Sequence, residues 1–347
     1  MEKSKLKSIG LILVNNRPTS KLTPKIAGMG IGLPDKVLTN HDFEKIVDTS
    51  DEWITARTGI KERRVLEENE NPSSLAVSSS RQAIDRSPVS DSDLDLVIVA
   101  TNVSDMPIPG SAPFVADHLK TESDIPFFDL KAGCSGFLYS LDVAYNLIRS
   151  NNYQNILVIG LEALSRVVNW RDRSTCILFG DAAGAAVISN SGATGTILAS
   201  AIYGDPTKSD LITVKGGGTR FPAANGKKED NSYYIEIKGK GVFKSAVNMM
   251  KDASVKVLAQ AGLKLKDIDW IVPHQANIRI IKQLAKSLDV KMNKVVVNVD
   301  KYANTSTATI PVALDEAVRG HSIQTGDVVL LVAFGAGAAY GATVLKW

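Results

Sequence analysis

Short apolar segments alternate with helical patterns along most of the chain. Five segments are apolar and uninterrupted enough to predict strands: residues 94–100, 156–159, 268–272, 295–299 and 328–332. Continuous apolar strands are typical of parallel sheets that helices cover on both faces. The alternation of such strands with helices therefore predicts an α/β protein.

Three pairs of segments repeat one another at a nearly constant distance. DLDLVIV at residue 93 resembles DIDWIVP at 267, NILVIG at 155 resembles DVVLLV at 327, and DLKAGC ending at Cys134 resembles VDKYAN ending at Asn304. The offsets are 174, 172 and 170 residues. This repetition predicts two copies of one α/β unit that meet near residues 190–200, with a site between the halves that draws on both.

The composition excludes several classes of protein. Forty basic and thirty-seven acidic residues leave a net charge of +3, too balanced for a protein that binds nucleic acid through its overall field. Two cysteines cannot form a disulfide framework or a four-ligand zinc site, and residues 9–14 are too short an apolar run for a signal peptide, so we expect a cytoplasmic protein. Residues 328–345 carry no charge, but three glycines near their end favour a strand, a loop and a final strand over a membrane span.

Cys134 is the candidate nucleophile. A predicted buried strand at 126–130 precedes it, and a helical pattern begins at 134–136. Free N–H groups and the helix dipole at such a position favour a thiolate and can hold an oxyanion. A small buried cysteine in a strand-to-helix turn is the structural alternative, and it is our interpretation of Cys176.

His274 and Asn304 are the candidate partners of this thiol. His274 follows the predicted strand 268–272, and ligands bind at strand ends in α/β sheets. Asn304 occupies the repeat position equivalent to Cys134, at the start of the corresponding helix. The alternatives are a structural histidine and a simple N-cap.

Together these three residues suit thioester chemistry. A thiolate accepts an acyl group, and two neutral hydrogen-bond donors can stabilise the enolate oxygen that forms when a malonyl thioester loses carbon dioxide. A Cys/His protease would need the histidine as a base for the thiol, and nothing in the sequence indicates a peptide-binding site.

Five motifs in order resemble the β-ketoacyl-[acyl-carrier-protein] synthase III family. They are TSDEWITARTGIKERR (49–64), KAGCSGF (131–137), RDRSTCILFGDAAGAAV (171–187), VPHQANIRII (272–281) and NTSTATIPVALDEAV (304–318). The resemblance implies a thiolase-like fold, in which duplicated α/β halves form a five-layered αβαβα core. It runs from about residue 24 to 347 and divides the chain into an N-terminal extension (1–23), a first half with the nucleophile (24–195) and a second half with the histidine and asparagine (196–347).

The resemblance also implies the reaction and the site. The family is an acyltransferase of type II fatty acid synthesis that condenses an acyl-CoA primer with malonyl-acyl-carrier protein, without cofactor or metal. The resemblance implies that Cys134 is acylated, that His274 and Asn304 promote decarboxylation, and that the backbone of Cys134 and Ala336 forms the oxyanion hole. The implied substrate contacts are Thr49, Trp53, Arg57, Arg173, Phe243, Ala276, Asn277 and Phe334, with Trp53 and Arg173 on either side of the adenine.

The carrier protein is acidic, and a basic helix face is available for it. Arg279, Lys282 and Lys286 share one side of the helix after His274, and Lys244 lies at another matching position. A merely solvated face would have the same pattern. We expect no nucleic acid or membrane partner, and we expect a homodimer in which Ile108 lies near the partner's acyl pocket.

Some residues depart from the family pattern. Ala336 replaces a common glycine, and Ala338, Ala339 and Tyr340 stand where Phe, Thr and Trp are frequent, so the acyl pocket is expected to differ in shape. A relative that uses the same acyl-Cys intermediate to make a polyketide, a quinolone or an ester is the alternative function. A thiolase would need a second cysteine in the last glycine-rich loop, which has none, and neither glycine pair of a dinucleotide-binding oxidoreductase has the required context.

Overall fold

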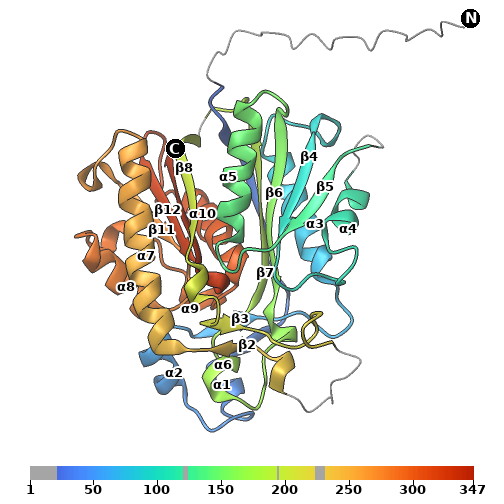
Figure 1. Cartoon of the computed structure of the whole chain (residues 1–347), viewed down its shortest axis with the longest axis vertical. Coiled ribbons are helices and arrows are strands. Elements are labelled where there is room, and N and C mark those ends of the chain that lie inside the picture. Colours follow the sequence, from blue (N-terminus) through green and yellow to red (C-terminus); the bar gives the residue numbers. More distant parts are fainter. Residues whose placement is uncertain (1–21, 120–123, 194, 223–230) are drawn as a thin grey trace, which may run out of the picture.

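The structure is a computed structural model that describes residues 22–119, 124–193, 195–222 and 231–347. Most of the chain alternates between strands and helices (Figure 1). The strands are β1 (Lys25–Gly32), β2 (Val37–Thr39), β3 (Glu62–Arg64), β4 (Leu96–Ala100), β5 (Phe127–Leu130), β6 (Asn155–Ala163), β7 (Asp181–Ser189), β8 (Thr196–Gly204), β9 (Ile212–Thr213), β10 (Glu236–Ile237), β11 (Trp270–Pro273), β12 (Val328–Phe334) and β13 (Ala339–Lys346). The α-helices are α1 (Asn40–Phe43), α2 (Asp51–Thr58), α3 (Pro72–Asp85), α4 (Ala112–His118), α5 (Gly136–Arg149), α6 (Arg173–Cys176), α7 (Gly239–Gln260), α8 (Ile278–Ser287), α9 (Val299–Tyr302) and α10 (Thr309–Arg319).

The strand order shows the duplication that the sequence predicts. The large sheet runs β11-β12-β13-β8-β1-β7-β6-β4-β5, and the pairing of Lys25 with Thr196 joins its two halves. In the first half, β4 is parallel to β6 and β6 is antiparallel to β7. In the second half, β11 is parallel to β12 and β12 is antiparallel to β13, so the same pattern recurs.

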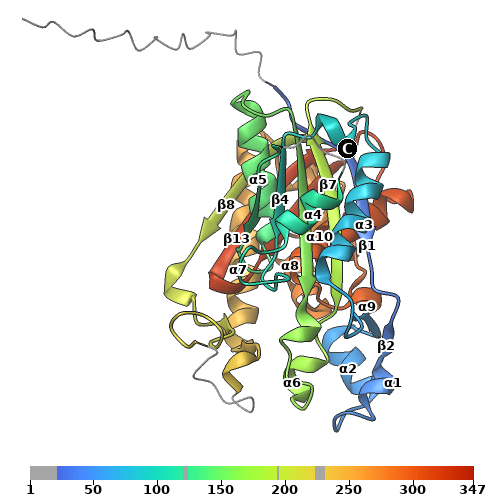
Figure 2. The same ribbon diagram turned by 90° about the vertical axis from the view of Figure 1, so that its right-hand side faces the viewer.

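Helices cover the sheet halves in layers (Figures 1 and 2). α3 packs on β1, β6 and β7, and α7 packs on β8, β12 and β13, so these helices form the two outer layers. α5 contacts both β6 and β8, and α10 contacts both β7 and β11, so this pair lies between the halves. The layers are therefore αβαβα, which confirms the predicted fold class.

The middle helices bury apolar faces on both sides. α5 is helical because its apolar residues recur at helical spacing, and Phe137, Leu138, Leu141 and Ile148 are almost completely buried. They share one core cluster with Leu314 of α10 and with strand residues from both halves. This shared core fixes the starts of α5 and α10 relative to each other, and those starts carry the candidate site.

Two predicted strands differ from the structure. β5 was predicted to be buried, but it is an edge strand on which Phe127 and Phe128 are exposed. At 295–299 only Val295 pairs with a strand, through an isolated bridge to Ile271, and α9 begins at Val299. The reason is a buried glutamine: Gln275 donates to Val296 O and accepts from Asn298 N, which satisfies backbone groups that a further strand would otherwise bond.

The uncharged segment 328–345 forms β12, a tight turn and β13, as predicted. Within the described residues, no helix is long and apolar enough to cross a membrane. The division at residues 195 and 196 stays a prediction. The proposed extension lies outside the described residues except for its last two positions.

Candidate active site

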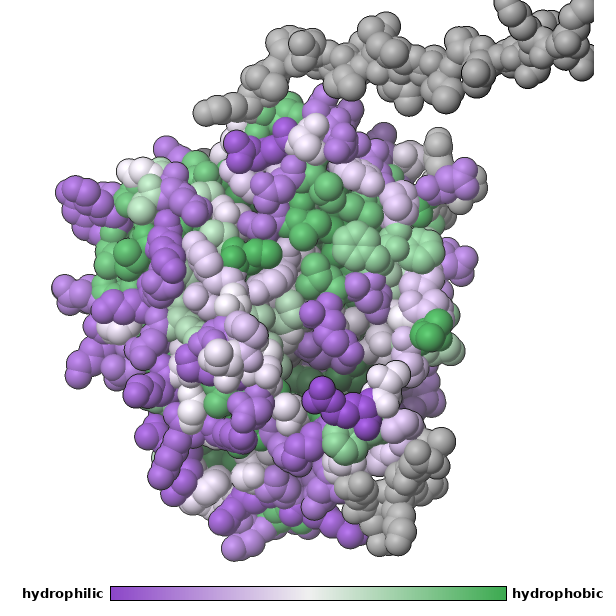
Figure 3. Space-filling view, in the orientation of Figure 1, coloured by the Kyte–Doolittle hydropathy of each residue, from purple (hydrophilic) through white to green (hydrophobic). Residues whose placement is uncertain are grey.

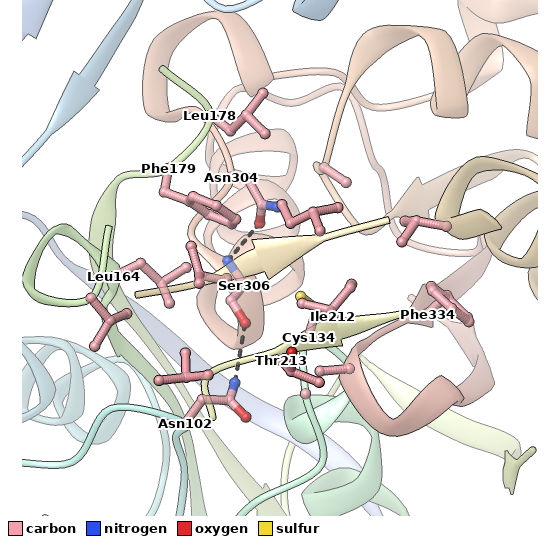
Figure 4. A pocket seen from close by; sticks show the side chains of 18 of the residues that line it. Asn102, Cys134, Leu164, Leu178, Phe179, Ile212, Thr213, Asn304, Ser306 and Phe334 are labelled. Carbon is pink, nitrogen blue, oxygen red and sulfur yellow. Dashed lines mark hydrogen bonds between the residues drawn. The ribbon is translucent and has the colours of Figure 1, made fainter. Parts of the chain in front are cut away.

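A cavity of about 1040 Å³ opens between the two halves and contains the three candidate catalytic residues. Cys134 comes from the first half, whereas His274 and Asn304 come from the second. Most of the other side chains that line it are apolar, including Leu164, Phe179 and Phe334 (Figure 4). The structure therefore brings the predicted nucleophile and both predicted partners to one largely apolar chamber.

Two glycine-containing loops interlock at the thiol. Cys134 lies two residues before α5, and Gly133 has a left-handed φ of 56°. A Cβ at Gly133 would lie 2.3 Å from Ala336 N, and a Cβ at Gly335 would lie 2.3 Å from Cys134 N, so neither loop has room for a side chain there. This approach directs the N–H groups of Cys134 and Ala336 at the sulfur, where both lower the pKa of the thiol. The two predicted oxyanion donors thus point to one place.

The Cys134 thiol is nevertheless protonated in the free protein. Burial raises its pKa to about 12, while the Ser306 hydroxyl and the two backbone N–H groups lower it only in part and the nearby Glu162 raises it. The expectation that the helix start favours a thiolate is therefore wrong for the resting site, because loss of hydration outweighs the dipole. Acylation then requires a group that removes the proton.

His274 directly follows β11, and its backbone N–H continues the ladder by donating to Val332 O at 2.8 Å. Its Nδ1 lies 2.6 Å from Thr309 Oγ1, which in turn bonds Ser306 O at 2.9 Å. Nε2 is therefore the nitrogen that remains for a substrate. Burial lowers the pKa of His274 to about 3, so the ring is neutral and carries a single proton.

Asn304 lies five residues before α10 rather than at its first turn, because a short 3-10 segment (Ser306–Ala308) intervenes. Its Oδ1 accepts from Ser306 N at 2.9 Å, and its backbone bonds Leu178 O and Gly180 N. Since a backbone N–H can only donate, the bond fixes which end of the amide is oxygen. The Nδ2 group is then the end available to the cavity.

Three polar residues near the thiol were missed by the sequence analysis: Glu162 and Ser306, which are buried, and Asn102, which is partly buried. Glu162 is completely buried in β6 and accepts from Asn102 Nδ2 at 2.5 Å, and Asn102 Nδ2 also lies 3.3 Å from Ser306 Oγ (Figure 4). Burial raises the pKa of Glu162 to about 7, although Asn102, Ser306 and Thr307 lower it by hydrogen bonding. The available signal was a lone acidic residue inside an apolar strand, which is costly unless partnered.

The predicted CoA contacts fall into two groups. Phe243, Ala276, Asn277 and Phe334 line the cavity, whereas Thr49, Trp53, Arg57 and Arg173 lie outside it. Asn277 connects the two groups, because its Nδ2 donates to Arg57 O at 3.2 Å. Helix α2 is capped by Ser50, the residue after Thr49, whose side chain accepts from Trp53 N.

Both guanidinium groups lie over the indole ring of Trp53. The guanidinium carbon Cζ lies 4.3 Å from the ring centroid in Arg57 and 4.8 Å from it in Arg173. Arg173 also donates to Asp48 O at 2.6 Å. The separation between Arg173 and Trp53 leaves no room for a base between them, since two stacked contacts need roughly 7 Å at about 3.5 Å each.

The four basic residues predicted to contact the carrier protein lie on the surface. Lys244 on α7 and Arg279, Lys282 and Lys286 on α8 are exposed, and Arg279 also lines the cavity.

The residues that depart from the family pattern differ in their relation to the cavity. Ala336 lines the cavity, and its φ is not positive, so a Cβ is tolerated there. Ala338, Ala339 and Tyr340 do not line the cavity, and Tyr340 stacks on Tyr203 instead. The expected change in pocket shape stays a prediction.

Comparison with known proteins agrees with this geometry. Two family models match, described as 3-oxoacyl-[acyl-carrier-protein] synthase III (residues 128–206) and its C-terminal part (residues 258–347). A β-ketoacyl-[acyl-carrier-protein] synthase III from Caldanaerobacter subterraneus subsp. tengcongensis is 46% identical over 327 residues, which cover 94% of this chain and 98% of the relative. The chain belongs to the β-ketoacyl-[acyl-carrier-protein] synthase III family.

Solved structures support the same assignment. The crystal structure of the Aquifex aeolicus synthase III is 44% identical, with a TM-score of 0.86 over 93% of this chain and 100% of that chain. The priming β-ketosynthase of the R1128 polyketide pathway is 31% identical, with a TM-score of 0.85 over 95% of this chain and 98% of that chain. Relatives of known name at 41–46% identity are synthases III, so the polyketide alternative is not favoured.

Proposed function

We propose that Cys134, His274 and Asn304 carry out the two half-reactions of an initiating condensing enzyme of fatty acid synthesis. In the first, Cys134 takes an acyl group from acyl-CoA. In the second, malonyl-acyl-carrier protein loses carbon dioxide and its carbanion attacks the acyl-Cys thioester to give β-ketoacyl-acyl-carrier protein. The observation that carries the proposal is the convergence of the three residues, from both halves, on one cavity beside two backbone N–H donors.

Acyl transfer uses the interlocked loops. When the sulfur attacks a thioester carbonyl, negative charge develops on the carbonyl oxygen, and the N–H groups of Cys134 and Ala336 are the donors nearest to that point. They are held rigid by the close approach at Gly133 and Gly335, so little reorganisation is needed during the reaction. The long apolar cavity suits an acyl chain and a pantetheine arm together.

Decarboxylation uses the two side-chain donors. Asn304 Nδ2 and His274 Nε2 are the polar ends left for the malonyl thioester oxygen. A neutral histidine donates from Nε2 only when Nδ1 is unprotonated, so the Thr309 hydroxyl, which donates to Ser306 O in the free protein, must turn and donate to Nδ1 instead. Both donors are neutral, so they favour the enolate without trapping the departing carboxylate as a cation would. Both half-reactions are thioester chemistry, so the proposal includes no cofactor and no metal.

The CoA nucleotide is proposed to stack on Trp53. Because Arg173 lies on this ring, Arg173 must swing away before an adenine can enter between them. Stacking of a base on an aromatic ring contributes about 1–3 kcal/mol. Trp53→Ala should therefore raise the KM for acyl-CoA about tenfold and leave the KM for acyl-pantetheine, which lacks the nucleotide, unchanged.

The acyl-carrier protein is proposed to dock on the exposed cations of α7 and α8. Lys282 and Lys286 have no ion-pair partner among the described residues, and Arg279 joins their face to the cavity wall. Complementary charge of this kind mainly accelerates association and depends on ionic strength.

A homodimer through the β5 edge is part of the proposal. No strand of the described residues pairs with this edge, which presents Phe127 and Phe128. Met106 and Ile108 are nearby in the sequence, and Ile108 is 86% exposed. Apolar surface covers the region of α5 and β5 in Figure 3. Exposed apolar edge strands are favourable sites for pairing with a second chain. A placement of Ile108 at the partner's acyl pocket and a cytoplasmic location remain predictions.

The assignment of roles is tested by separating the half-reactions. His274→Ala and Asn304→Ala should still accept the acyl group from acyl-CoA in a single turnover. Each should lose most decarboxylation of malonyl-acyl-carrier protein, because one enolate donor is worth about 3 kcal/mol, or roughly a hundredfold in rate. Wild-type decarboxylation in both variants would contradict the assigned roles.

A further inference from the structure

Glu162 is a buried carboxyl that the two half-reactions above do not use. It is the next-to-last residue of β6 and is completely inaccessible to solvent. The side chains that hydrogen-bond to it are uncharged: Asn102 after β4, and Ser306 and Thr307 before α10. Its negative charge raises the pKa of the nearby Cys134 thiol. No cation neutralises this carboxyl within the described residues, which is unusual for an acidic group in a protein core.

Ser306 connects this carboxyl to the nucleophile. Asn102 Nδ2 donates to both the Glu162 carboxyl and the Ser306 hydroxyl, which places that hydroxyl beside the carboxyl, and Ser306 lines the cavity together with Cys134. In keeping with this position, Ser306 lowers the pKa of both the Cys134 thiol and the Glu162 carboxyl by hydrogen bonding. A hydroxyl has one proton, so it can donate to only one of the two at a time and accepts from the other. The Ser306 side chain is held in place by Asn102 Nδ2, and its backbone is held by Asn304 (Figure 4). The arrangement is therefore a two-bond path from the thiol to the carboxyl.

The other candidate base is less suitable. Burial lowers the pKa of His274 to about 3, so the imidazole holds an additional proton poorly. Burial raises the pKa of Glu162 to about 7, which places its proton affinity between that of an ordinary carboxyl and that of the thiol. A group that titrates near the working pH is the most effective proton acceptor.

We propose that Glu162 accepts the proton of Cys134 through Ser306 during acylation, an inference that rests on the proposed function. The thiol proton passes to Ser306 Oγ as the hydroxyl proton passes to a Glu162 oxygen. The sulfur then forms a bond to the acyl carbon, and the bond from that carbon to the CoA sulfur breaks. The proton then returns from Glu162 to Ser306 as the Ser306 hydroxyl proton passes to the CoA thiolate. Glu162 is again a carboxylate, and CoA leaves as the thiol. Ser306 touches the reacting sulfur, whereas Glu162 acts through Ser306.

The test is the pH dependence of single-turnover acylation of Cys134 between pH 6 and 9. In the wild type the carboxylate is available above pH 7, so the rate should rise through about pH 7 and then level. Glu162→Gln and Ser306→Ala should be about a hundredfold slower at pH 8. Their rates should increase about tenfold per pH unit without levelling, because they depend on ionisation of a thiol whose pKa is about 12.

Controls separate a relay from a structural effect. Glu68→Gln changes an exposed carboxyl and should keep the wild-type profile. Glu162→Gln should still reach one acyl group per chain at long times, which shows that the site is assembled. A wild-type profile in Glu162→Gln would overturn the relay, and so would a variant that stays unacylated even at pH 9. If the wild type itself places no acyl group on Cys134, the proposed function fails, whereas altered profiles with normal labelling concern the relay alone.

Discussion

The buried carboxyl of Glu162 should make the stability of the protein depend on pH in a defined direction. The folded state raises the pKa of this group from its ordinary value of 4.5 to about 7, because burial removes its hydration. Between these two pH values the folded chain holds a proton that the unfolded chain has released. Stability from this group is therefore fully present below about pH 4.5 and is lost as the pH rises through about 7.

The magnitude follows from the size of the shift. A difference of about 2.5 pKa units, at about 1.4 kcal/mol per unit, corresponds to about 3 kcal/mol. Glu162→Gln cannot titrate and keeps a similar shape. The free energy of unfolding of this variant, minus that of the wild type, should therefore increase by about 3 kcal/mol between pH 4.5 and 8.

Urea unfolding of both proteins at a series of pH values measures this difference directly. Subtraction removes the titration of all other groups, which the two proteins share. The exposed Glu68→Gln variant should give a difference that does not change with pH. A flat difference curve for Glu162→Gln would show that the buried carboxyl ionises as it does in water, and the reasoning about the desolvated site would be refuted.

Three further results are expected. Thr309→Val removes the hydroxyl that bonds His274 Nδ1, so the rate of decarboxylation of malonyl-acyl-carrier protein should fall at least tenfold. Thr309→Ser keeps the hydroxyl and should retain most of this rate. Equal rates for the two variants would contradict the role of the hydroxyl. Gly133→Ala places a Cβ 2.3 Å from a backbone nitrogen at a left-handed φ, so acylation should be lost, whereas Gly204→Ala, which meets only ordinary contacts, should be acylated normally. Lys282→Glu should raise the KM for malonyl-acyl-carrier protein severalfold at low salt, with little effect in 0.5 M salt and none on transfer from acyl-CoA; a change in the acyl-CoA reaction would argue against docking.

Much of the fold was predictable because it depends on local apolar patterns that repeat. The buried strands β4, β6 and β12 are continuous apolar runs, and the offset between the halves places β4 and β11 at equivalent positions. The edge position of β5 was not predictable, since its two phenylalanines are equally typical of a buried strand. The irregular segment 295–299 was missed because the side chain that replaces its strand partner is distant in the sequence.

The site was predictable in its parts but not in its electrostatics. Cys134, His274 and Asn304 follow from strand ends, helix starts and the family motifs, and the structure places all three around one cavity. The pKa of the thiol was predicted in the wrong direction, because the helix dipole is visible in a sequence whereas the loss of hydration at the folded site is not. The contacts among Ser306, Glu162 and Asn102 join three distant segments, so they too require the structure.

The identity of the nucleophile is the claim on which the whole mechanism depends. Incubation of the protein with acyl-CoA, followed by intact mass measurement and peptide mapping, tests it most directly. The structure predicts one added acyl group per chain, on the peptide that contains Cys134, and none on the fully buried Cys176. An unchanged mass, or an acyl group found only on Cys176, would contradict the account.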